Sequence, residues 1–395
     1  MEEKLAALLE EAVDGVMDEV IAFRRQLHRR PELGFETFET MELISKILTE
    51  AGIGHKTHCA ESGVVARIPS KGSGHKLALR GDIDALPVTE QTSLPFASEI
   101  EGRMHACGHD NHAAIALGSA LVLNRLQGRL PGETLVVFQP AEEGPTLPTG
   151  ARRIMAEGHL DGVREIYGLH VSNELMVGQI GYRCGNFMAS ADMLNVKFTG
   201  KASHAAYPHK GVDALLVACR FVDAVQTVVS RMSDPLEPIV ISFGRMIAGE
   251  AGNVLAGEAQ LWGTMRTYNK ELQRRALAAI EQMANETAAM YGATAEVKIT
   301  QAIGSVVNDK RTTQKLERVA RELLGEEQVV ALENPSMGGE DFSGYLDAIP
   351  GTFYNLGTSD GVNREPLHSS TFDVDERALR VGVRLMCALA LDPER

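Results

Sequence analysis

The stretch from Met104 to His112 limits the folds open to this chain more than any other segment. It places three histidines, one cysteine and one aspartate within eight consecutive positions, His105 to His112. Thiolate and imidazole groups are ligands that zinc and similar divalent ions prefer in proteins. The spacing alone does not choose which members bind. The alternative interpretation is that Asp110 caps a helix beginning at Ala113 and that its polar neighbours are incidental.

Further candidate ligands follow apolar runs elsewhere in the chain. Asp82 ends one such run, Glu142 and Glu143 follow a second, and His170 ends a third, while His368 lies near the C-terminus. Taken singly, the two histidines would be ordinary polar residues. Together, these separated segments indicate a metal-dependent enzyme whose fold brings them to the His-rich stretch.

The apolar periodicity predicts strands that alternate with helices. Strands are expected at 77–82, 134–139, 166–170 and 352–356, and helices at 3–30, 37–51, 113–126, 312–324 and 375–391. Such alternation is typical of an α/β domain with a mainly parallel sheet flanked by helices. Ligands of these sheets bind beyond the carboxyl ends of the strands, where Asp82, Glu142 and His170 lie. The sequence therefore predicts one site at this edge.

The pattern changes between residues 187 and 302. Strands are expected there at 193–198, 239–243, 259–267 and 295–300, with helices at 212–232 and 271–291. The order βαββαβ is that of the ferredoxin-like motif. Because the α/β pattern then resumes, we expect a discontinuous catalytic domain of residues 1–186 and 303–395, with 187–302 inserted as a small α+β domain.

The Glu142–Glu143 pair is the sharpest chemical signal. Beside a metal ion, one carboxylate can bind the ion while the other takes a proton from the attacking water. The alternative is a solvated turn. The segment Arg80–Asp84 leaves three possibilities open: a further ligand, a carboxylate that orients a ligand histidine, or a plain turn at the end of a strand.

The composition argues against several classes of partner. The 39 basic and 53 acidic residues leave a net charge of −14, which disfavours nucleic acid and anionic membranes. No apolar run approaches the ~20 residues of a membrane span, and the acidic N-terminal segment lacks the layout of a signal peptide. The five scattered cysteines form no CxxC pair, so we expect reduced thiols and a cytoplasmic location.

Ten segments resemble the co-catalytic metal aminoacylase and carboxypeptidase family, and within it the branch of hippurate hydrolases and indole-acetyl-amino-acid amidohydrolases. They extend through most of the chain: Leu27–Gly34, Arg80–Pro87, Met104–His112, Gln139–Gly144, Gly168–His170, Gly200–Ala206, Asn253–Val254, Gly263–Arg266, Met337–Phe342 and Pro366–His368. No other fold would require all ten in this order.

The resemblance implies a role for each matching position. The implied metal ligands are Cys107, His109, Glu143, His170 and His368, with Glu142 as the general acid/base. It also implies that the inserted domain is a lid that mediates dimerisation. There, His204 would polarise the scissile carbonyl from across the dimer, and Asn253 and Arg266 would hold the carboxylate of the substrate.

We therefore expect a cytoplasmic amidohydrolase that removes the acyl group from an N-acyl amino acid. It would use two divalent metal ions per subunit (Zn, Mn, Co or Ni) and act as a homodimer or a dimer of dimers, with no nucleic acid or membrane partner. The alternatives are a carbamoyl-amino-acid hydrolase or a dipeptidase on the same scaffold. A non-catalytic small-molecule binding protein is the alternative from a different class, against which the intact Glu142 argues.

Overall fold

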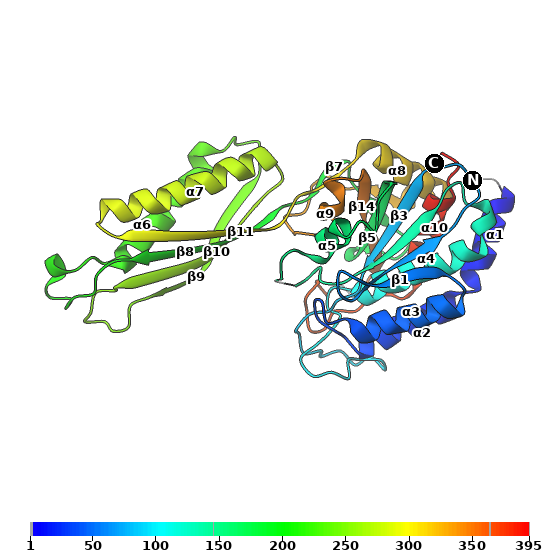
Figure 1. The fold of residues 1–395 in the computed structure, drawn as a ribbon, viewed down its shortest axis with the longest axis horizontal. Helices are drawn as coiled ribbons and strands as arrows, with labels where there is room; N and C mark the ends of the chain where they lie inside the picture. The colour runs from blue at the N-terminus through cyan, green and yellow to red at the C-terminus, as the bar shows by residue number, and fades with distance from the viewer. Residues whose placement is uncertain (1–2, 145, 363–364, 395) are drawn as a thin grey trace. The chain divides into compact units, whose positions relative to one another are not determined.

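The computed structural model describes residues 3–144, 146–362 and 365–394, which form two compact units (Figure 1). The large unit extends to Phe187 and also contains Val307–Asn334 and the chain from Asp341 onward. The inserted unit contains Met188–Val306 and Pro335–Glu340. The last of these segments falls in the part of the sequence expected to belong to the larger domain.

An eight-stranded mixed sheet organises the large unit. Its order is β1-β2-β4-β3-β5-β14-β6-β13. The four central strands, from β4 to β14, run parallel as expected, whereas the outer pairs β1–β2, β2–β4 and β14–β6 are antiparallel. The strands are β1 (Gly54–Cys59), β2 (Gly63–Ile68), β3 (Lys76–Asp82), β4 (Thr134–Gln139), β5 (Val163–Met176), β6 (Ile180–Tyr182), β13 (Val329–Ala331) and β14 (Gly351–Ser359).

Helices cover this sheet, and α4 lies at the centre of the core. It is buried along almost its whole length, the polar residues of its first turn included, and it packs against β3, α2 and α10. The α/β fold class is thereby confirmed. The helices are α1 (Glu3–Asp14), α2 (Met17–Arg29), α3 (Phe38–Glu50), α4 (His109–Arg125), α5 (Gly150–Ala156), α8 (Lys310–Leu324), α9 (Ser343–Leu346) and α10 (Arg377–Leu391).

The inserted unit has the expected βαββαβ order and an antiparallel sheet ordered β11-β8-β10-β9. Asp213 and Asn269 cap its two helices by accepting hydrogen bonds from backbone N–H groups of the first turn. Phe198, Phe221 and Leu261 belong to its separate apolar core. The elements are β8 (Ala191–Thr199), α6 (Ala214–Thr227), β9 (Ile239–Ala248), β10 (Glu258–Thr267), α7 (Lys270–Met290) and β11 (Thr294–Ile303).

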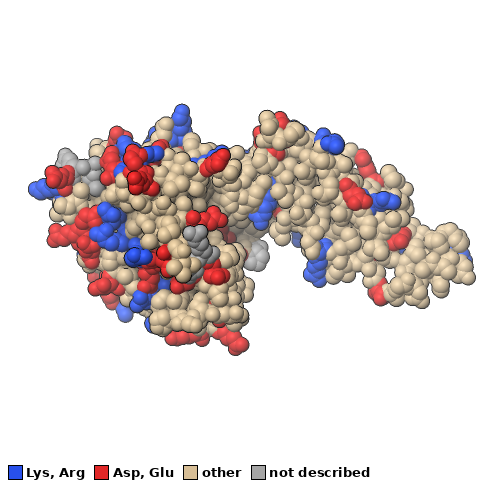
Figure 2. Space-filling model, turned by 180° about the vertical axis from the view of Figure 1, so that it is seen from behind, with Lys and Arg blue, Asp and Glu red and all other residues tan. Residues whose placement is uncertain are grey.

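Two short strands, β7 (Gly185–Met188) and β12 (Val306–Asn308), pair as a separate ladder. Among the described residues, no helix combines the length and apolarity required to cross a membrane. Acidic and basic side chains are mixed over the face of the large unit seen in Figure 2.

Candidate metal centre

The two expected ligands of the His-rich stretch lie at the start of α4. The helix begins at His109, four residues before the expected start, because Gly108 adopts a left-handed conformation (φ 82°) that glycine tolerates best. A Cβ at Gly108 would lie 2.3 Å from Cγ2 of Val171. Cys107 therefore precedes the helix in a tight turn against β5, and His109 is its first residue.

Asp110 does not cap the helix, so the capping interpretation was wrong. Its carboxylate, fully buried, accepts hydrogen bonds from Arg24 Nε (2.7 Å) and His28 Nδ1 (2.8 Å). Those bonds tie α4 to α2. Asp110 is thus committed to an ion-pair network.

Five ligand-type side chains gather in two groups of three that share one member. Cys107, His109 and His170 form the first group, and Cys107, Glu143 and His368 form the second, with the ligand atoms of each group within 4.8 Å of one another. His170 Nε2 and His368 Nε2 both lie 3.3 Å from Cys107 Sγ. These five are the residues expected from the sequence, and the structure brings all of them together.

His109 Nε2 provides an independent indication of a cation. It is buried and has no hydrogen-bond partner among the described residues. Carboxylate oxygens of Asp82 and Glu142 nevertheless lie 3.7 and 4.0 Å away. Burial alone would lower the pKa of His109, but Asp82, Asp84 and Glu143 outweigh it and raise the pKa to about 10. The donor set therefore fits divalent metal ions.

The surroundings shift the pKa values of His170 and Cys107 in opposite directions. Burial, together with His112 and His109, lowers the pKa of His170 to about 3, so its imidazole is neutral and can offer a lone pair. Burial and then Glu143 raise the pKa of the Cys107 thiol well above its ordinary value. A bound cation would favour the thiolate that this environment otherwise disfavours.

Asp84 holds three parts of the site with one carboxylate. Its Oδ1 accepts from Glu142 N (3.1 Å) and lies 3.3 Å from His109 Nδ1, while Oδ2 accepts from Glu143 N (3.1 Å). Of the possibilities left open for Arg80–Asp84, the structure therefore supports a carboxylate that orients a ligand histidine, because His109 Nε2 is left facing the other ligands.

His112, another member of the cluster, has no nitrogen available for an ion. Its Nδ1 lies 2.6 Å from Asp82 Oδ1, and its Nε2 accepts the N–H of Val171 at 2.9 Å. His105 is buried and belongs to none of the candidate groups. Within the His-rich stretch, Cys107 and His109 are the two residues that lie in a candidate ligand group with His170, which spacing alone could not indicate.

The backbone is strained at or directly beside two of the expected site residues. His368 adopts φ 67° and Ala141, directly before Glu142, adopts φ 53°. Each such residue costs on the order of 1–3 kcal/mol and persists only when its surroundings impose it. His368 N donates to Ala106 O (2.8 Å), which fixes this strained residue beside Cys107. Its side chain remains 54 % exposed, so the centre is open on this side.

A buried network behind the Glu142–Glu143 pair was not expected from the sequence. Arg80 Nη2 donates to Asp341 Oδ1 (3.0 Å), Gln139 Nε2 donates to both oxygens of Asp341, and Tyr345 Oη donates to Gln139. Asp341 N in turn lies 3.4 Å from Glu142 Oε1. The polar Gln139 at the end of an apolar run was the one sequence feature that could have indicated this network.

The three remaining expected residues lie in the inserted unit. The loops of His204 and Asn253 are joined by the bond from Ala205 N to Asn253 O (2.9 Å). Ala206 N donates to His204 Nδ1 (3.1 Å), which leaves the Nε2–H of the neutral ring as a donor. Arg266 is at the other end of β10, where its Nη1 donates to Met337 O (3.3 Å). The unit therefore brings His204 and Asn253 together, but not Arg266.

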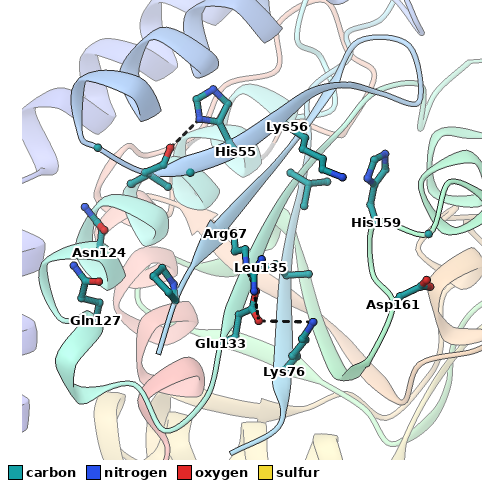
Figure 3. A pocket seen from close by; sticks show the side chains of 16 residues that line it. His55, Lys56, Arg67, Lys76, Asn124, Gln127, Glu133, Leu135, His159 and Asp161 are labelled. Atoms are coloured by element: carbon teal, nitrogen blue, oxygen red, sulfur yellow. Dashed lines mark hydrogen bonds and ion pairs between the residues drawn. The ribbon is translucent and has the colours of Figure 1, made fainter. Parts of the chain in front are cut away.

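A cleft of about 750 Å³ lies at the other end of the large sheet, and the expected ligands do not line it (Figure 3). Lys56, Arg67 and Lys76 border it, but Glu133 pairs with the last two of these. Lys76 begins β3 and Asp82 ends it, so the cleft is roughly 20 Å along the strand from the metal centre.

Comparison with known proteins identifies the family. The profile of peptidase family M20/M25/M40 matches residues 78–392. The chain belongs to this family. Among its relatives, N-acetylcysteine deacetylase of Bacillus subtilis (strain 168) is 39% identical over 94% of this chain and 96% of its own. The IAA-amino acid hydrolase ILR1-like 2 of Arabidopsis thaliana is 35% identical over 95% of this chain and 85% of its own.

Two solved structures match this chain over nearly its whole length. A putative aminohydrolase from methicillin-resistant Staphylococcus aureus matches with a TM-score of 0.93 and 31% identity, over 98% of this chain and 100% of that one. The YXEP protein of Bacillus subtilis, described as a dinuclear metal binding peptidase of the M20 family, matches with a TM-score of 0.83 and 37% identity over 96% and 98%. The resemblance stated from the sequence motifs is thereby confirmed.

Proposed function

We propose that this member of the family is a dinuclear metal amidohydrolase that cleaves N-acyl amino acids to a carboxylate and a free amino acid. The observation that carries the proposal is the convergence of two three-ligand groups beside Glu142. The relatives add the substrate class, because one is named for deacetylating N-acetylcysteine and another for hydrolysing conjugates of an amino acid.

Cys107, the one member common to both groups, would help to hold both ions. His109 and His170 would complete one site, and Glu143 and His368 the other. Bound ions would polarise the scissile carbonyl and lower the pKa of water. Asp84 would keep the ligands in place from behind.

Glu142 would carry out the proton transfers. Its carboxylate is almost fully buried and its backbone is fixed by Asp84, so it can hold one position next to the ligands. It would take one proton from the attacking water and deliver it to the nitrogen of the leaving amine. The water oxygen forms the new C–O bond, and the C–N bond breaks.

Arg266 would bind the α-carboxylate that all N-acyl amino acids share. A guanidinium can donate two parallel N–H groups to the two carboxylate oxygens. We expect amidation of the substrate α-carboxylate to cost roughly 2–5 kcal/mol in kcat/KM, because a desolvated charge pair is lost. Steady-state rates with an N-acetyl amino acid and its amide check this, and equal rates would contradict it. In an Arg266→Gln variant, the two substrates should become nearly equivalent.

The inserted unit supports a site shared between two copies of the chain. His204 follows β8 in a loop held by the Gly200 N to Gly257 O bond, at one end of β10, whereas Arg266 lies near the other end. About eight residues of strand separate them, roughly 26 Å. One inserted unit therefore cannot place both side chains on the same small substrate. We infer that His204 and Arg266 serve different active sites in a homodimer.

The edge of the inserted sheet offers a surface for this second copy. β9 is an edge strand with exposed Met246 and Ile247. Unpaired strand edges and exposed apolar side chains favour association. A homodimer formed here would extend the sheet and cover these side chains.

Mixing two inactive variants tests the exchange of His204. As an oxyanion donor, it should contribute ~10²–10³-fold in rate, so His204→Ala should be nearly inactive. Combining it with Glu142→Gln and exchanging subunits should restore activity, because each mixed dimer contains one site with both groups intact. A mixture that exchanges subunits, as shown by mass spectrometry of the dimers, and remains inactive would contradict the proposal.

A turnover screen tests the proposed function as a whole. The metal-loaded protein should release free amine from N-acetyl and N-benzoyl amino acids, detected with an amine-reactive dye. A binding protein would instead show only a thermal shift with the same compounds, with no amine released.

A further inference from the structure

A buried pair beside the metal centre, His112 and Asp82, has no part in the chemistry described above. We propose that His112, held in one tautomer by Asp82, is a positioning residue that fixes the direction of the ligand His170. The inference rests on the proposed function only in taking His170 as a metal ligand.

The hydrogen bonds of His112 define its role as an acceptor toward β5. Its Nδ1 lies 2.6 Å from Asp82 Oδ1, and its Nε2 lies 2.9 Å from the backbone nitrogen of Val171. A carboxylate only accepts and a peptide N–H only donates, so the proton of the neutral ring is on Nδ1 and the lone pair is on Nε2. The imidazole that makes these two hydrogen bonds is almost fully buried.

The Val171 N–H needs this side chain because the sheet no longer provides a partner on that side. The ladder between β3 and β5 ends with the pair Arg80 and Gly168. Three residues further along β5, the acceptor is the imidazole of α4 in place of a strand. A buried N–H without an acceptor would cost about 1–3 kcal/mol.

Fixing the Val171 N–H fixes His170, since the two residues share that peptide. The backbone oxygen of Val171 also contributes, because it accepts a hydrogen bond from His170 Nδ1 at 2.8 Å. This bond leaves His170 Nε2 aimed at Cys107 Sγ. The two imidazoles also contact each other edge to face, with ring centroids 4.7 Å apart. His112 thus acts on both the backbone and the ring of His170.

Asp82 is itself held rigidly. Arg80 Nη1 donates to its Oδ2 at 2.5 Å, and both side chains are buried. Gly81 allows this approach of β3 to α4, because a Cβ there would lie 2.5 Å from His112 O. Outer hydrogen bonds of this kind typically alter metal affinity by 10–100-fold when they are removed.

A matched pair of substitutions separates the hydrogen bond from simple packing. In His112→Gln the amide oxygen can reach the position of Nε2 and accept the Val171 N–H, whereas the shorter side chain of His112→Asn cannot. Thr352→Val, a buried change in the β14 strand away from the ligands, serves as the control for stability. The probe is Co²⁺ alone, whose visible spectrum reports the geometry of its ligands.

We expect His112→Asn to weaken Co²⁺ binding about 10–100-fold in chelator competition and to alter the visible bands. His112→Gln should remain closer to wild type, and Thr352→Val should bind Co²⁺ normally whatever its thermal stability. Equal affinity and identical spectra for His112→Asn and wild type would overturn the proposal. Equal losses in the Asn and Gln variants would also overturn it, because packing would then explain the effect.

If His112→Asn does not fold, the Asp82→Asn variant tests the positioning role of His112 instead. In this variant Arg80 would donate to the amide oxygen, so the amide N–H group would face His112 Nδ1. The ring proton would then move to Nε2, where it would meet the Val171 N–H and break that hydrogen bond. The Co²⁺ spectrum must then change; an unchanged spectrum contradicts the proposal, even if the lost charge lowers affinity. Failure of wild-type protein to bind Co²⁺ would instead reject the proposed function.

Discussion

Replacing Glu142 with glutamine is expected to lower turnover by ~10²–10⁴-fold while both metal ions remain bound. The amide has nearly the shape of the carboxylate but cannot take a proton from water. Because Glu142 belongs to neither of the two groups that share Cys107, metal content should not change. Rates with an N-acetyl amino acid, together with metal analysis of the same sample, check both statements.

The neighbouring carboxylate provides the control for Glu142. Glu143→Gln should lose metal as well as activity, because Glu143 is in a ligand group with Cys107 and His368. If Glu142→Gln stays within tenfold of the wild-type rate, the proton-transfer role belongs to another side chain, and Glu340 is the next to test.

Cys107→Ala is expected to abolish activity by removing the one ligand that both groups share. Loss of a thiolate common to both groups should weaken metal binding at both, so the purified variant should hold well below two ions per chain. Metal analysis after dialysis against a fixed concentration of Zn²⁺ measures the loss.

Cys387→Ala is the matched control for this thiol. Cys387 is also fully buried, and burial raises its pKa too, but its Sγ contacts Ser119 O on α4 and no ligand group. The Cys387→Ala variant should be less stable than the wild type but should bind the same amount of metal. Full occupancy and normal turnover in Cys107→Ala would reject the assignment of Cys107.

The elements with strong periodicity could be predicted from the sequence. The apolar runs of β3, β4 and β5 are buried on both faces, so they stand out and place Asp82, Glu142 and His170 at one edge. In contrast, β1 reads Gly-His-Lys-Thr-His-Cys and has little apolar signal, because it is an edge strand. The edge strand β1 was therefore missed, and so was β2, although its short apolar run is buried between β1 and β4.

The ligand set could be predicted only in part from spacing. His109 and His112 lie three residues apart on α4, and their different roles depend on Asp84 and on Val171. Those partners are distant in sequence from the helix, so local patterns contain no information about the choice. The start of α4 depends similarly on the left-handed Gly108, which the apolar periodicity does not register.

Stepwise metal loading, with turnover measured at each step, tests whether the protein is a dinuclear amidohydrolase. Apoprotein would be titrated with Zn²⁺ or Mn²⁺, and release of free amino acid from an N-acyl amino acid would be followed beside metal content. We expect hydrolysis to reach its full rate as occupancy approaches two ions per chain. Binding of the same substrates without hydrolysis at any loading would contradict it.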